Sequence, residues 1–176
     1  MKKNNSVRKV TVAALFAAMT FVGTIVHIHI PGMITGYVNL GDCFVLVSGI
    51  LLGPLYGAFA AGIGAGMADF LHGYMYYVPA TFVIKALMAV VAYYLYYLFS
   101  KGKKEYKTCP LVISGIVAEI IMIFGYFFYE GAVMPGINYA AAALGILGNF
   151  AQAVLGIVLS VVVIRVMKKT NVIEMI

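Results

Sequence analysis

Residues 79–104 read PATFVIKALMAVVAYYLYYLFSKGKK, an apolar run that is followed directly by a cluster of lysines. The run up to Ser100 is long enough for an α-helix to cross the hydrocarbon core of a membrane, which is about 30 Å thick. Pro79 suits the first turn of a helix, where its missing N–H group is not needed. Because lysine and arginine gather in cytoplasmic loops, the stretch predicts a transmembrane helix that ends on the cytoplasmic side.

The other basic residues repeat this pattern. The chain contains 12 Lys and Arg residues, and all except Lys85 fall in three short clusters between long apolar stretches. Each cluster indicates a return of the chain to the cytoplasm. Lys85 lies inside an apolar run, so the topology does not explain it. The clusters are Lys2, Lys3, Arg8 and Lys9, then Lys101, Lys103, Lys104 and Lys107, and finally Arg165, Lys168 and Lys169.

The composition places the chain among integral membrane proteins. It is 64% hydrophobic and 10% charged, with a mean hydropathy of +1.01. A soluble domain carries about 25% charged residues. The formal net charge of +6 therefore reflects membrane topology and gives no reason to expect nucleic-acid binding. The first apolar run, 10–26, follows a basic segment as in a signal peptide, but no small-residue cleavage site follows it, so we expect it to be retained.

We expect an all-α membrane protein, a single domain over residues 1–176 with six transmembrane helices and both termini in the cytoplasm. The run 41–52 is unusually short, at roughly 20 Å, and is predicted to begin below the outer surface. That leaves a depression, which the preceding loop of residues 27–40 could cover. The expected helices cover residues 10–26, 41–52, 55–71, 79–100, 110–129 and 138–166.

Two ionisable residues lie within the expected spans, where charge is costly and a functional role is the default hypothesis. Lys85 is about 9 Å below the start of its helix. It either forms a structural pair, for which Asp69 is a plausible counter-ion at similar depth, or presents an amine to a ligand. Glu119 is near the midplane of helix 110–129 and is expected to be protonated or to bond a ligand donor.

Two helices are predicted to carry polar stripes. Spacings of three and four residues place side chains on one helical face. The two stripes suggest an internal polar cavity, although hydrogen bonds between helices explain Asn149 and Gln152 equally well. The first stripe is Glu119, Met122, Tyr126 and Glu130; the second is Asn138, Gly145, Asn149, Gln152 and Gly156.

Other polar residues favour structural interpretations. Asn39 and Asp42 resemble a helix start, with Asn39 as the cap and Asp42 in the first turn. Tyr74, Tyr76 and Tyr77 fit either an aromatic belt at the membrane surface or the wall of a pocket. The histidines lack the spacing of a metal site, so neither a metal nor a cofactor is expected. No catalytic or nucleotide-binding motif is present, and we expect no enzymatic activity.

The order of several motifs resembles the substrate-binding S components of energy-coupling factor (ECF) vitamin transporters. The resemblance extends over nearly the whole chain and is greatest to the branch for riboflavin, pyridoxine and hydroxymethylpyrimidine. It does not specify the substrate. The motifs are GYVNLGD at 36–42, LLGPLYG at 51–57, AGMAD at 65–69 and YVPATFVIK at 77–85.

This resemblance implies a multi-pass protein of the prokaryotic plasma membrane that captures a vitamin from outside under a closing loop between the first two helices. It also implies docking on a transmembrane scaffold subunit that two ATPases drive, through an Ala-x-x-x-Ala motif. Ala13 with Ala17 and Ala14 with Ala18 both fit that motif. The implied substrate-binding candidates are Lys85, Glu119, Tyr126, Glu130, Asn149, Tyr37, Asn39 and Tyr77.

The sequence leaves the substrate open. Carboxylates beside tyrosines favour a donor-rich heteroaromatic ring such as hydroxymethylpyrimidine or pyridoxine, whereas Lys85 would also suit an acceptor such as pantothenate. Riboflavin is the other alternative within the family. Glu119 at mid-depth motivates a different class of function, a solitary transporter coupled to protons or ions.

Overall fold

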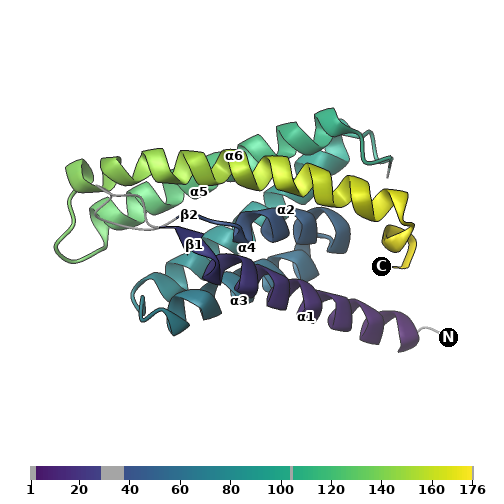
Figure 1. The fold of residues 1–176 in the computed structure, drawn as a ribbon, viewed down its shortest axis with the longest axis horizontal. Helices are drawn as coiled ribbons and strands as arrows, with labels where there is room; N and C mark the ends of the chain where they lie inside the picture. The colour runs from purple at the N-terminus through teal and green to yellow at the C-terminus, as the bar shows by residue number, and fades with distance from the viewer. Residues whose placement is uncertain (1–2, 29–37, 104, 176) are drawn as a thin grey trace.

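The computed structural model describes residues 3–28, 38–103 and 105–175. Within these ranges the chain forms six α-helices, a two-stranded antiparallel sheet and a terminal 3-10 helix (Figure 1). The helices are α1 (Lys3–Ile25), α2 (Gly41–Leu52), α3 (Pro54–Leu71), α4 (Tyr77–Phe99), α5 (Thr108–Ala132) and α6 (Tyr139–Lys169). The short elements are β1 (His27–Ile28), β2 (Val38–Asn39) and η1 (Val172–Met175).

The six expected helices are present, and their bounds differ mainly at the polar ends. α1 begins at Lys3, seven residues before the start that hydropathy predicted at Val10. Backbone hydrogen bonding continues beyond the membrane-embedded part of a helix, whereas hydropathy detects only that part. Among the described residues, four helices are long and apolar enough to cross a membrane: Ser6–Ile25 within α1, and α4, α5 and α6 over their full lengths.

Both ends of the described chain lie at the same end of the bundle (Figure 1). The second and third basic clusters meet there, because Lys168 Nζ donates to the carbonyl oxygen of Glu105 at 2.6 Å. Lys107 Nζ lies 2.7 Å from a Glu105 carboxylate oxygen, and its hydrogen bond and charge lower the pKa of that carboxyl. This grouping of basic side chains fits the cytoplasmic end predicted from the sequence.

The short helix α2 lies at the centre of the bundle. It packs against α1, α3, α4 and α6, and nine of its twelve residues are buried. Glycine permits the close approach of backbones there. A Cβ on Gly49 would lie 2.8 Å from the Cα atom of Ala89 in α4, and a Cβ on Gly57 of α3 would lie 2.7 Å from the Cα atom of Gly49.

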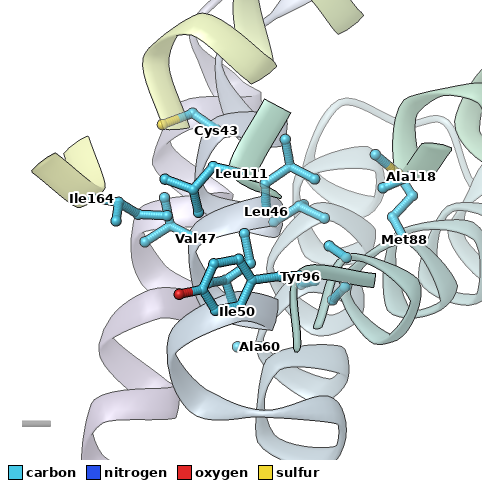
Figure 2. Packing of buried hydrophobic residues seen from close by; sticks show 14 of the residues in the cluster. Cys43, Leu46, Val47, Ile50, Ala60, Met88, Tyr96, Leu111, Ala118 and Ile164 are labelled. Carbon is cyan, nitrogen blue, oxygen red and sulfur yellow. The ribbon is translucent and has the colours of Figure 1, made fainter. Parts of the chain in front are cut away.

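Apolar side chains around α2 form the core nearer the cytoplasmic end. Leu46, Val47 and Ile50 of α2 share a cluster with Met88 and Tyr96 of α4 (Figure 2). Leu111 and Ala118 of α5 and Ile164 of α6 belong to the same cluster. The ionisable residues Lys85, Asp69 and Glu130 lie instead around a cavity in the opposite half.

Candidate functional site

A polar cavity of about 50 Å³ lies among the helices in the half of the bundle away from the termini. It has room for roughly three or four water molecules. The lining combines hydroxyl groups, carboxylates, amides and one amine, and every helix from α3 to α6 contributes to it. The lining residues are Thr24, Asn39, Ala65, Asp69, Tyr74, Tyr77, Thr81, Lys85, Tyr126, Glu130, Asn149 and Gln152.

The inner side of the cavity is built on an ion pair. Lys85 Nζ of α4 bonds Oδ1 of Asp42, and both side chains are almost completely buried. Gln152 Nε2 of α6 donates to the other carboxylate oxygen of Asp42 at 2.6 Å. A buried carboxylate that has two such donors is stable only because they replace the water it has lost. Asp42 therefore ties α2 to α4 and α6.

The sequence leaves open whether Lys85 pairs with a carboxylate such as Asp69 or faces a ligand, and in the structure Lys85 forms an ion pair with Asp42. The reason is the depth of α2. Because this helix begins below the outer surface, its first turn lies at the level of Lys85, more than a turn into α4. Asp42 is in that first turn, as expected, but its side chain bonds neighbouring helices and caps nothing. Asp69 also lines the cavity.

Asn39 connects the β2 strand to the same network. Its backbone N–H and its side-chain amide both donate to Gln152 Oε1 at 3.0 Å. Its side-chain oxygen accepts the backbone N–H of Gly41, the first residue of α2, at 2.8 Å. The prediction that Asn39 is the N-cap of this helix is wrong, because the capping position is Leu40, although the Asn39 side chain does bond the first residue of the helix.

Aromatic side chains form a second wall. Tyr77 donates its hydroxyl to Glu130 at 3.2 Å, and the hydroxyls of Tyr126 and Thr81 lie 3.0 Å apart. The rings of Tyr77 and Tyr126 are 6.5 Å apart, and Lys85 Nζ lies 5.5 Å from the centre of the Tyr126 ring. These rings offer flat apolar faces, and the carboxylate of Glu130 offers an acceptor beside them.

Six of the eight substrate-binding candidates from the sequence line the cavity, namely Lys85, Tyr126, Glu130, Asn149, Asn39 and Tyr77. Glu119 is buried outside the cavity lining. Tyr37 lies outside the described residues, as does His29 among the three histidines. The sequence reasoning did not select Thr24, Ala65, Asp69, Tyr74, Thr81 and Gln152 as binding residues.

Helical spacing contained a signal for one of the missed residues. Thr81 falls midway between Tyr77 and Lys85 in α4, so the three are separated by four residues each and share a face. All three line the cavity. Gln152 was already in the polar stripe of its helix, but its hydrogen-bond partner Asp42 comes from a distant part of the chain. Spacing within α6 therefore gave no sign of that bond.

The alanines of α1 divide between two faces. Ala13 and Ala17 are partly buried against the core, and the carbonyl oxygen of Ala17 contacts the position of a Cβ on Gly64 in α3. Ala14 and Ala18 are exposed on the other face, beside Leu15 and the strongly exposed Val22. The two registers of the Ala-x-x-x-Ala motif are therefore distinct: one packs within the bundle and one faces outward.

Sequence comparisons place the chain in a known family. The family model for ECF-type riboflavin transporter S components matches residues 4–169. The thiamine precursor transporter HmpT of Lactococcus lactis is 26% identical over 172 residues, which cover 97% of this chain and 94% of that protein. An uncharacterized protein of Pyrococcus woesei is 35% identical over 109 residues, covering 62% of this chain and 68% of its own length.

Solved structures show the same fold. The S component of a bacterial ECF transporter superposes with a TM-score of 0.73 at 18% identity, over 94% of this chain and 98% of the other. The biotin S component of an ECF-type ABC transporter gives 0.63 at 20% identity, with 96% and 95% covered. ThiT of Listeria monocytogenes gives 0.58 at 22% identity, with 94% and 96% covered. The chain therefore belongs to the family of ECF-type riboflavin transporter S components and is a multi-pass membrane protein.

Proposed function

We propose that the polar cavity binds a small, donor-rich heteroaromatic vitamin or vitamin precursor, with hydroxymethylpyrimidine as the first candidate and pyridoxine as the second. The observation that carries this proposal is the wall of Tyr77, Tyr126 and Glu130 facing Lys85 across the cavity. The name of the Lactococcus lactis relative, a thiamine precursor transporter, supports the same class of substrate.

The chemistry of the lining matches such a ring. Tyrosine faces stack on an aromatic ring, and carboxylates accept hydrogen bonds from an exocyclic amino group. Lys85 can donate to a ring nitrogen or to a hydroxymethyl oxygen. Asp69 and Glu130 together outnumber the one amine of the lining, which disfavours an anionic ligand. We propose that the single domain of six helices binds its ligand at this site, in the half that we assign to the outer side.

The size of the cavity supports a one-ring ligand over riboflavin. At about 50 Å³ it is far below the 300–1,000 Å³ typical of sites for drug-sized ligands. A single ring needs a modest shift of the lining side chains, whereas three fused rings with a sugar-alcohol chain need a larger one. Riboflavin, which the family model names, and pantothenate, which Lys85 suits, remain the alternatives.

ATP-driven transport would need partner subunits, since the sequence shows no motif for ATP hydrolysis. We propose that it captures substrate outside and docks on an ECF transmembrane scaffold that two ATPase subunits drive. The exposed pair Ala14 and Ala18 is the proposed docking register. Small side chains let helices approach closely in lipid, and Ala13 and Ala17 already use that property inside the bundle.

Two measurements test the substrate. Mass spectrometry of small molecules that co-purify with the protein identifies the ligand without prior choice. Calorimetric titration with hydroxymethylpyrimidine, pyridoxine, riboflavin and pantothenate then ranks affinities, with Glu130→Gln as the site variant. Glu105→Gln, at the opposite end of the bundle, is the matched control. We expect micromolar or tighter binding that weakens at least about tenfold in Glu130→Gln alone. Absence of binding by all four compounds would contradict the proposal.

A solitary transporter coupled to protons or ions is the candidate from another class, and Glu119 is the observation that favours it. Uptake into vesicles discriminates between the two. Substrate accumulation in vesicles that contain this protein alone, driven by a pH gradient, supports the solitary transporter. Accumulation that requires the scaffold, the ATPases and ATP supports the S component.

A further inference from the structure

Glu119 of α5 is the most deeply buried carboxyl group whose role the binding site leaves unexplained. It is 1% exposed, and neither of its carboxyl oxygens has a hydrogen-bond partner among the described residues. It is also not part of the cavity lining. A buried polar group without a partner costs free energy, and an ionised one costs much more. The position therefore calls for a functional explanation.

Gly156 of α6 lies beside both Glu119 and Asp42, and its lack of a side chain lets them approach each other. A Cβ on Gly156 would lie 2.8 Å from Glu119 Oε1 and 2.9 Å from the Cβ atom of Asp42. Those two atoms are therefore separated by at most about 6 Å, the sum of the two distances. Any side chain at position 156 would occupy the space between them. The glycine leaves Glu119 facing the carboxylate that Lys85 and Gln152 already bond.

If Glu119 and Asp42 were both ionised, their two negative charges would face the single positive charge of Lys85. The charged groups that act on Glu119 are Asp42 from α2 and Lys85 from α4. From α6 it faces Gly156, and the nearby Gln152 is neutral. One amine thus serves two carboxyl groups. Asp42 has the amine and an amide as donors, whereas Glu119 has no donor among the described residues.

We propose that Glu119 is a proton-binding site, which holds a proton as a neutral carboxylic acid. When a ligand bonds Lys85 and moves it away from Asp42, the O–H group of Glu119 donates to Asp42 in place of the amine. Glu119 is then a positioning residue that acts through Asp42 and Lys85 without touching the ligand. No covalent bond forms or breaks in this exchange, and the proton stays on Glu119 throughout. The second half of the proposal rests on the proposed function, because it requires a ligand that bonds Lys85.

The exchange explains how a buried ion pair can open in the middle of a membrane. If Lys85 leaves Asp42, the carboxylate keeps only the bond from Gln152. Removing one partner of a buried pair is strongly destabilising, because the remaining charge is uncompensated. A carboxylic acid O–H that points across Gly156 restores the second donor. The ligand then competes with a replacement donor, and the cost of separating the pair falls.

Infrared spectroscopy of the detergent-solubilised protein without ligand tests the proton. The C=O stretching band of a protonated carboxylic acid at neutral pH is expected in the wild type, absent in Glu119→Gln and unchanged in Glu105→Gln. A spectrum without such a band, or with a band that persists in Glu119→Gln, overturns the proposal. A thermal stability that depends on sodium or potassium through Glu119 overturns it too, since a bound cation would then balance an ionised carboxylate.

A second infrared comparison tests the exchange without any ligand. Lys85→Met and Lys85→Leu both remove the amine from Asp42, supply no other donor in its place, and so imitate its withdrawal. The acid band is expected to move to lower frequency in whichever of these variants folds, because the O–H group now donates to Asp42. The band must also disappear from the corresponding double variant with Glu119→Gln. An acid band at the same frequency with and without the amine overturns the exchange.

Affinity for hydroxymethylpyrimidine provides a third readout that a purely structural role would not reproduce. Glu119→Gln keeps a neutral donor and should bind within about threefold of wild type, whereas Glu119→Met removes the donor and should weaken binding at least about tenfold. Met122→Leu, a buried neighbour on the same helix, is the packing control. Equal affinities of the Gln and Met variants overturn the positioning role. Failure of the wild type to bind any candidate vitamin refutes the proposed function alone, and the two infrared tests still decide the proton site.

Discussion

Lys85 and Asp42 are 43 residues apart in the sequence and form a buried ion pair in the structure. The pair joins α4 to the first turn of α2, and Gln152 extends it to α6. Three helices therefore depend on one carboxylate. Because the amine of Lys85 also lines the cavity, the same contact that holds the bundle together is in a position to respond to a ligand.

Breaking this pair from one side should destabilise the protein. Lys85→Met removes the positive charge that balances the buried Asp42, which a neutral donor such as the Glu119 O–H group does not replace, and we expect a loss of about 3–5 kcal/mol in the free energy of unfolding. Thermal unfolding in detergent, followed by circular dichroism, measures the effect. Lys107→Met removes an exposed pair with Glu105 and should leave the unfolding temperature unchanged. The double variant Lys85→Met with Asp42→Leu should recover much of the loss, and a double variant no more stable than the single one would contradict this account.

Gln152 should hold the β2 strand in place. Its side-chain oxygen accepts two bonds from Asn39, so Gln152→Leu leaves buried donors without a partner and should cost about 2–3 kcal/mol. Hydrogen exchange at the Asn39 amide should accelerate more than exchange in the middle of α5. Ser160→Ala, which removes a local bond within α6, is the control. Unchanged protection of Asn39 would mean that the strand is held by other contacts.

Close packing of α2 on α4 should make Gly49 intolerant of any side chain. A Cβ there would meet the backbone of Ala89, which cannot move aside as a flexible side chain would. Gly49→Ala should cost about 1–3 kcal/mol, measured by thermal unfolding. Gly66→Ala is the matched control, because the nearest atom to its new Cβ is 3.5 Å away. Similar unfolding temperatures for the two variants would refute the packing argument.

The outward face of α1 should matter for assembly only. Ala14→Leu and Ala18→Leu add bulk to exposed positions, so the unfolding temperature should stay the same while co-purification with the scaffold subunit falls at least about tenfold. Ala17→Leu should instead destabilise the isolated protein, because Ala17 packs against α3 at Gly64. Normal assembly of the Ala14 and Ala18 variants would eliminate this register as the docking face.

The helices could be predicted from the sequence because runs of apolar residues and clusters of basic residues consist of neighbours in the chain. Each of the six predicted apolar runs corresponds to an observed helix, and α2 is as short as predicted. Much of the cavity could be predicted as well, since Lys85, Tyr126 and Glu130 stand out as polar residues on apolar helices. These signals need no knowledge of how the helices pack.

Pairings between helices could not be predicted in the same way. The choice between Asp42 and Asp69 as the partner of Lys85 depends on the depth at which α2 begins and on which helices surround it. The placement of Glu119 behind Gly156, outside the cavity lining, likewise depends on the rotation of α5 against α6. Spacing within one helix assigns a residue to a face but does not say which neighbour that face meets.

Because α2 lies at the centre of the bundle, its length does not have to match the thickness of the bilayer. A lipid-facing helix of twelve residues, about 18 Å long, would force the surrounding membrane to thin or the protein to tilt. Here α1, α3, α4 and α6 surround the helix and keep it from acyl chains. Changes in lipid composition that thicken or thin the membrane therefore act on the outer helices, and the ion pair at the start of α2 is insulated from hydrophobic mismatch.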